Sequence, residues 1–166
     1  MKKILVILIM FIGTINISAQ ENNEAILQKI DSLQSQLNEL QIDYEFHKLH
    51  SELQKLYIEL KTYSNNMNIK TNEILINCHQ GYANETLYEA YKESYDIQVS
   101  QLNAYKEAVN IIKSAIHLKT YEIKFTDKQL STFDKGIKTV NSVVDLAEHS
   151  LNHYKTVMSM YKDLIR

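Results

Sequence analysis

The fold of this chain is decided by the stretch from Tyr88 to Ile165, which reads YEAYKESYDIQVSQLNAYKEAVNIIKSAIHLKTYEIKFTDKQLSTFDKGIKTVNSVVDLAEHSLNHYKTVMSMYKDLI. An apolar or aromatic residue recurs there at every seventh position: Tyr88, Tyr95, Leu102, Val109, Ile116, Ile123, Leu130, Ile137, Val144, Leu151, Met158 and Ile165. A second row, three residues further on, is mostly apolar as well: Tyr91, Tyr105, Ile112, Phe133, Val140, Ala147, Tyr154 and Tyr161, with Gln98, Lys119 and Thr126 between them. Alternating spacings of three and four place both rows on one side of an α-helix. The stretch is therefore predicted to be helical.

Two arrangements of this stretch compete. The unbroken phase through Leu130 favours one helix over residues 84–166, paired with a second copy as a coiled coil. The segment Thr126-Asp127-Lys128-Gln129 has the Thr-x-x-Gln form of a capping box, with an acidic residue in the first turn, and favours a new helix there. We predict two helices, over 84–125 and 126–166.

The preceding part of the chain contains two apolar series with the same alternation of three and four. The first is Ile26, Ile30, Leu33, Leu37, Leu40 and Tyr44; the second is Ile42, Phe46, Leu49, Leu53, Leu56, Leu60, Tyr63 and Met67. Their frames differ by two residues, which we interpret as a local change of supercoil in one helix over 22–63. Ser64, Asn65, Asn66 and Asn68 then predict a turn. Residues 64–83 are expected to form a connecting appendage with a short helix, and Asn84 to cap the helix that follows.

The residues from Gln20 onward include no Pro and only Gly81 and Gly136 as glycines, so few turns are available and a sheet is not expected. The predicted fold class is all-α: an elongated antiparallel three-helix bundle with long helices. Three helices of similar length, each about 60 Å long, can cover one another's apolar stripes from end to end.

The first residues have the layout of a secretory signal peptide. Lys2 and Lys3 precede the apolar run Ile4 to Ile12, and Ala19 provides a small residue before Gln20. We predict cleavage after Ala19, with residues 20–166 as the mature chain, no stable membrane anchor, and no lipid attachment, since no Cys lies near the cut. The segment resembles signal peptides from the Bacteroidetes. An exported protein, periplasmic or extracellular in a Gram-negative bacterium, is expected.

The net charge of the chain limits the kinds of partner that it can bind. Without Lys2 and Lys3 the chain has 16 basic and 20 acidic residues, a formal charge of −4. Lys and Glu alternate along the helices as on a solvated face, without a basic stripe. Nucleic acid and anionic membrane surfaces, which require clustered positive charge, are not expected as partners.

Candidate reactive residues are few. Asp145, His149 and His153 are four apart and share one helical face that could hold a divalent metal, but they point away from the seam, and we interpret them as a solvated polar face. Asp43, His47 and His50 form a similar half-site. Phosphate loops and nucleophile motifs are absent from the sequence. We predict no enzyme, no cofactor and no metal.

Tyrosine and cysteine indicate a contact surface instead. The chain has eleven Tyr and no Trp, and a phenol prefers the wet edge of a core or a protein interface. The candidate interface is Cys78, Tyr82, Tyr88, Tyr91 and Tyr95, for a protein partner or self-association as a homo-oligomer; a hydrated bundle end is the alternative. Cys78 is the single Cys, so it either packs as a small apolar residue or bridges two chains.

The signal peptide, the long helices and the segment Phe125-Thr126-Asp127-Lys128 resemble the TrbJ-like secreted proteins of conjugative type IV secretion systems. That resemblance implies a non-catalytic accessory component that works by protein–protein contacts. The chain also resembles periplasmic chaperones of the OmpH/Skp type in size, signal peptide and helices. It differs from them because it is acidic and lacks their initial strands. A metal-binding helical bundle is the third alternative.

Overall fold

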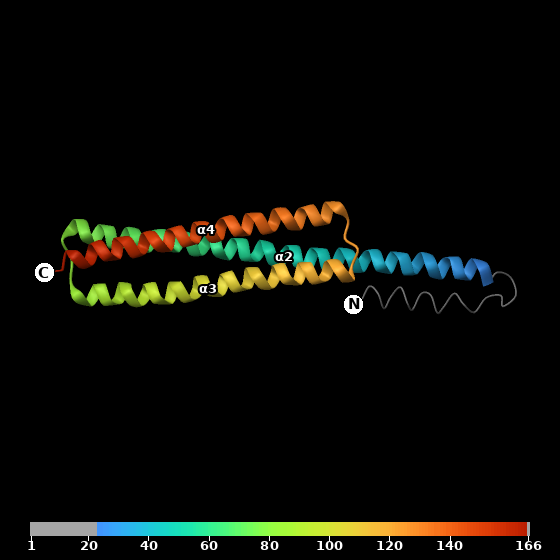
Figure 1. Ribbon diagram of the computed structural model, residues 1–166, viewed down its shortest axis with the longest axis horizontal. Helices are drawn as coiled ribbons and strands as arrows, with labels where there is room; N and C mark the ends of the chain where they lie inside the picture. The colour runs from blue at the N-terminus through green and yellow to red at the C-terminus, as the bar shows by residue number, and fades with distance from the viewer. Residues whose placement is uncertain (1–22, 166) are drawn as a thin grey trace. The chain divides into compact units, whose positions relative to one another are not determined.

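The structure is a computed structural model that describes residues 23–165, with side chains from residue 26 onward. It contains three helices: α2 (Asn23–Gln80), α3 (Glu85–Glu122) and α4 (Asp127–Asp163) (Figure 1). The predicted signal peptide, residues 1–19, lies outside the described residues. The chain forms two compact units that divide after Gln41, within α2. Residues from Ile42 onward form a three-helix bundle, which confirms the predicted all-α fold class.

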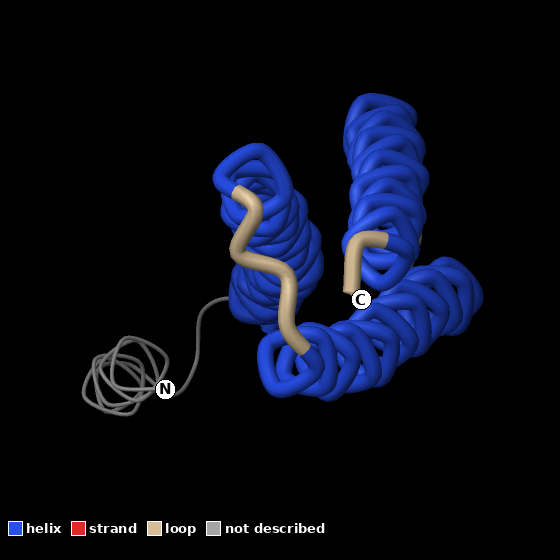
Figure 2. The backbone as a smooth tube through the Cα atoms, turned by 90° about the vertical axis from the view of Figure 1, so that its left-hand side faces the viewer, coloured by secondary structure: helices blue, strands red, loops and turns tan. Residues whose placement is uncertain are grey.

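Side-chain contacts define the topology of the bundle. Along α2, Tyr63 and Asn77 bond to Gln98 and Tyr91 of α3, so these two helices run antiparallel. In α4, Phe133 contacts Phe46 and Ser150 contacts Ser64, so α4 runs parallel to α2. The bundle is therefore up-down-up around a single core. Figure 2 views the three helices from one end.

The buried residues follow the predicted rows, but the better buried row differs between α3 and α4. In α3 the first row is the better buried, through Leu102, Val109 and Ile116. In α4 the second row is the better buried, through Phe133, Val140, Ala147, Tyr154 and Tyr161, whereas Leu130 of the first row is exposed. Each fully buried Leu or Phe side chain contributes about 1.5 to 3 kcal/mol. The seven-residue repeat thus identified the buried side of each helix to within one position.

Both predicted helix starts are confirmed. Asn84 caps α3 by accepting a hydrogen bond from Leu87 N at 2.9 Å. At Thr126 the capping box is complete: Gln129 N donates to Thr126 Oγ1 at 3.2 Å, and Thr126 N donates to Gln129 Oε1 at 2.9 Å. Residues 84–165 therefore form two helices and not one. The break between the two helices occurs at Ile123, where the backbone becomes extended. Phe125, in the connection after it, packs on Phe133.

The predicted appendage over 64–83 is wrong. Helix α2 continues without a break to Gln80, and the connection consists of Gly81 to Asn84. Ser64 is buried and shares a 2.8 Å hydrogen bond with Ser150, and Thr71 Oγ1 donates to Met67 O at 2.8 Å. Polar side chains that would compete with helix formation in an isolated peptide have hydrogen-bond partners here, within a continuous helix. Gly81 ends α2 with φ +70°, the left-handed conformation that favours glycine.

The predicted equality of the three helix lengths is wrong as well, since α2 has 58 residues, α3 has 38 and α4 has 37. The bundle core begins near Ile42 and Leu49 on α2. Residues 26–41, taken by themselves, are a helical segment with exposed side chains, except for the half-buried Leu33.

Candidate functional site

The predicted interface residues gather at one end of the bundle with two tyrosines of α4. Helix α3 supplies Tyr88, Tyr91 and Tyr95, and Tyr82 lies in the connection before it. Tyr91 and Tyr161 meet edge to face with ring centroids 5.2 Å apart, and Tyr95 stacks on Tyr154 at 6.2 Å. We call Tyr82, Tyr88, Tyr91, Tyr95, Tyr154 and Tyr161 the aromatic end.

Hydrogen bonds within the bundle engage three of the six hydroxyl groups of the aromatic end. Tyr154 OH donates to Tyr91 O at 2.9 Å, and Tyr161 OH donates to Tyr82 O at 2.6 Å. Asn77 Nδ2 donates to Tyr91 OH at 2.6 Å. Burial raises the pKa of Tyr91 and of Tyr154 above the ordinary phenol value, so both hydroxyls are neutral near pH 7.

One member of the predicted interface, Tyr82, is more accessible than this packed group. The Tyr82 side chain is exposed, while Cys78 is half-buried against the core. Burial raises the pKa of the Cys78 thiol above its ordinary value, which keeps it protonated and weakly nucleophilic. The structure explains Tyr91 and Tyr95 as packing residues, and a partner contact at this end remains a prediction.

The histidine set on α4 points away from the seam, as its position in the helical repeat predicted. Asp145, His149 and His153 are all exposed on α4, and Asp43 and His47 are exposed on α2. Within the part of the chain that the structure describes, no group of three or more His, Cys, Asp or Glu side chains is placed to hold a metal ion. None of the helices between residues 23 and 165 is long and apolar enough to cross a bilayer.

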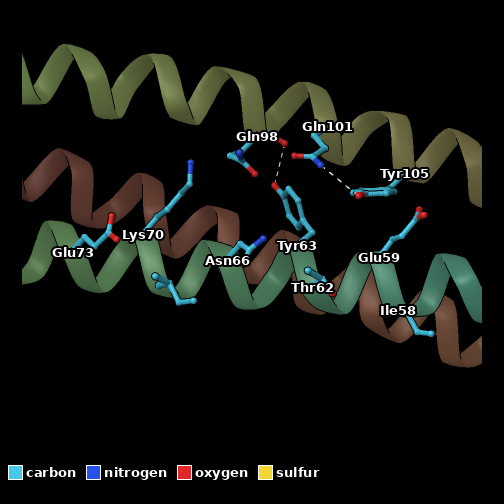
Figure 3. Close-up of a pocket in the computed structure, with 11 residues that line it drawn as sticks. Ile58, Glu59, Thr62, Tyr63, Asn66, Lys70, Glu73, Gln98, Gln101 and Tyr105 are labelled. Atoms are coloured by element: carbon cyan, nitrogen blue, oxygen red, sulfur yellow. Dashed lines mark hydrogen bonds between the residues drawn. The ribbon is translucent and has the colours of Figure 1, made fainter.

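A groove of about 450 Å³ opens between α2 and α3 (Figure 3). Its lining is rich in amides and charged groups: Asn66, Gln98, Gln101, Glu59, Lys70 and Glu73. At its floor Tyr63 OH donates to Gln98 O at 3.0 Å, and burial raises the pKa of Tyr63 to about 12. Its amide and charged groups can form hydrogen bonds and ion pairs with polar groups of another molecule.

The second candidate surface lies on the first part of α2, and sequence reasoning missed it. Ile26, Ile30, Leu33, Leu37 and Leu40 have coiled-coil spacing, and we call them the N-terminal stripe. The exposed fractions are 48% for Ile26, 42% for Ile30, 45% for Leu37 and 54% for Leu40. Large apolar side chains at this spacing are normally covered. The stripe is therefore an apolar helix face without a partner among the described residues.

The signal for this surface was present in the sequence. Tyr44 continues the frame of the N-terminal stripe and is exposed, whereas Ile42 and Phe46 pack against the bundle core. A two-residue offset corresponds to about 200° around an α-helix. Helix α2 continues through this offset without a break, as predicted, and the local change of supercoil stays a prediction.

No protein-family model, no curated protein and no solved structure matches this chain.

Proposed function

We propose that the protein is a non-catalytic, exported helical bundle that acts through protein–protein contacts, and that the N-terminal stripe makes them. The observation that carries the proposal is the stripe itself, with four of its five large apolar side chains exposed at coiled-coil spacing. A face of this kind gains free energy when another helix covers it, at about 25 cal/mol for each Å² of apolar surface removed from water.

The chemistry of the described residues supports a contact role over a catalytic one. The Cys78 thiol has a raised pKa, and three of the six tyrosine hydroxyls of the aromatic end are engaged in hydrogen bonds. No buried side-chain nitrogen or oxygen atom in the part of the chain that the structure describes lacks a hydrogen-bond partner.

The proposal also includes export of the protein and an accessory role in a secretion apparatus. The sequence pattern of residues 1–19 supports export, and the resemblance to TrbJ-like proteins supports an accessory role in a conjugative type IV secretion apparatus. Fractionation with mass measurement tests export: the periplasmic or extracellular protein should lack residues 1–19. Neighbouring genes for conjugative transfer would support the assembly, and neighbouring genes for outer-membrane assembly would favour a chaperone.

Photocrosslinking in the native cell tests the contact surface. A photoreactive phenylalanine analogue replaces Leu37 in the N-terminal stripe, and a matched variant carries it at Ile111, which is 62% exposed on α3. We expect one or a few discrete adducts from position 37 and none from position 111. A broad series of adducts from both positions would indicate a holdase chaperone, and no adduct from position 37 would contradict the proposal.

A further inference from the structure

We propose that the groove between α2 and α3 binds a neutral oligosaccharide. This inference goes beyond the proposed function and does not depend on it, because the groove is a different surface. All of its lining residues lie between Ile58 and Tyr105, within the compact unit that begins at Ile42. Its volume of about 450 Å³ falls in the usual range for small-ligand sites, roughly 300 to 1,000 Å³. From Glu59 to Glu73 it follows α2 for about 20 Å, which is longer than a single sugar ring.

The floor of the groove is a buried hydroxyl group that connects the two helices. The Tyr63 side chain is 3% exposed, and its hydroxyl donates to Gln98 O across the groove. Burial raises the pKa of Tyr63 to about 12, so this hydroxyl is neutral near pH 7. A phenol that donates one hydrogen bond can still accept another. The floor therefore offers an uncharged acceptor to a hydroxyl group of a ligand.

Both walls of the groove carry amide side chains. In Figure 3, Gln98 and Gln101 extend from α3 toward α2, and Asn66 lines the opposite wall on α2. A side-chain amide has two donor hydrogens and an acceptor oxygen. Gln101 uses one of its donors for Tyr105 OH, at 3.4 Å, and its oxygen is left for a ligand. A sugar hydroxyl both donates and accepts, so each of these amides can bind one in either direction.

The charges of the groove favour a ligand without net charge. Glu59 and Glu73 repel an anion. A cation meets carboxylates that are partly compensated, because Lys55 lies 3.8 Å from Glu59 and Lys70 lies between the two glutamates in the sequence. Lys70 Nζ donates to Ser94 Oγ at 2.7 Å. Ionised carboxylates only accept hydrogen bonds, and sugar hydroxyls can donate to them.

Apolar surface for a sugar ring is present as well. Tyr105 is half-buried at one end of the groove, where its ring meets Tyr63 edge to face with the centroids 5.9 Å apart. The C–H groups of a sugar ring can pack on such an aromatic side chain. On α2, Ile58 and Ile69 line the groove and are 61% and 58% exposed. They can contact the apolar groups of a second ring, such as the methyl of an acetamido group.

Titrations followed by NMR test the proposal. The purified, isotope-labelled protein receives chitotetraose or maltotetraose up to about 10 mM, which detects dissociation constants in the millimolar range. We expect shifts of the side-chain amide signals of Asn66, Gln98 and Gln101, with no change at Asn103 and Asn110, which are exposed on α3 outside the groove lining. Only chitotetraose carries acetamido groups, so a response to one sugar supports the proposal and shows which groups are recognised. No shift with either sugar, or equal shifts at all of these residues, would overturn it.

Two matched double variants test whether the groove amides hold the sugar. Gln98→Ala with Gln101→Ala removes the amides of one wall and should weaken binding by at least about fivefold, because two hydrogen bonds are lost. Asn103→Ala with Asn110→Ala removes two exposed amides of the same helix and should leave the affinity unchanged. Circular dichroism verifies that both variants keep their helices. Equal affinities of the two variants would overturn the proposal. Photocrosslinking at position 37 tests the N-terminal stripe separately, so either proposal can fail alone.

Discussion

Two parts of α2 carry the same sequence pattern and have opposite environments. From Ile42 onward the apolar series is buried, and Leu60 is 0% exposed. Over residues 26–41 the series has the same alternation of three and four, yet Leu37 is 45% exposed. Both are leucines at seam positions of one continuous helix. The comparison teaches that heptad spacing specifies an apolar stripe and the helix face that carries it. Which partner covers that stripe depends on its frame relative to the neighbouring apolar series.

The largest effect should come from truncating one leucine in each part. Leu60→Ala removes a fully buried side chain and should lower the free energy of unfolding by about 2 to 5 kcal/mol. Leu37→Ala, measured in dilute protein, should change it by less than about 0.5 kcal/mol. Urea unfolding followed by circular dichroism measures both. Equal losses would show that residues 26–41 share the bundle core, and the comparison would be broken.

The next effect concerns polar residues. Ser64→Ala leaves Ser150 buried without its hydrogen-bond partner and should cost about 1 to 3 kcal/mol. The double variant with Ser150→Ala removes both partners and should recover part of that loss. Ser35→Ala, at an exposed position of the same helix, is the control and should be nearly neutral. A double-mutant cycle gives the coupling between the two serines. Zero coupling would contradict a buried Ser64 in a continuous α2.

A smaller effect is the dependence of stability on alkaline pH. Burial, followed by the nearby Tyr95 and Tyr105, raises the pKa of Tyr63 from 10.0 to about 12 in the folded chain. Because the folded state holds the proton more tightly, this contribution is complete below pH 10 and is lost as the pH rises toward 12. Tyr63→Phe removes the hydrogen bond to Gln98 O and should therefore be less stable at neutral pH. It should lose stability less steeply above pH 10, because position 63 then has no phenol proton to release. Urea unfolding at several pH values measures both slopes, and parallel slopes would contradict a buried Tyr63 phenol.

Much of the fold could be predicted because local physics decides it. The seven-residue repeat identified the buried faces of α3 and α4, and Asn84 and the Thr126 capping box marked both helix starts. These features depend on residues no more than a few positions apart. The outward direction of Asp145, His149 and His153 followed from the same frame and agrees with their exposure.

The missed features depend on contacts between residues far apart in the sequence. Ser64 belongs in a helix because Ser150, 86 residues later, accepts or donates its hydrogen bond. The aromatic end was identified from α3, but Tyr154 and Tyr161, which engage it, lie on α4. The residues of the N-terminal stripe were recognised as a helical series, but only the structure shows that most of their side chains are exposed. A single sequence cannot show which face meets which partner.

Hydrogen–deuterium exchange along α2 of the purified protein tests the central claim most directly. Most of the stability of helices in proteins comes from the packing of an apolar face, so a helical segment whose apolar face is uncovered is marginal in water. We therefore predict fast exchange over residues 26–41 and slow exchange over residues 49–74. Equally strong protection of both parts would contradict the account.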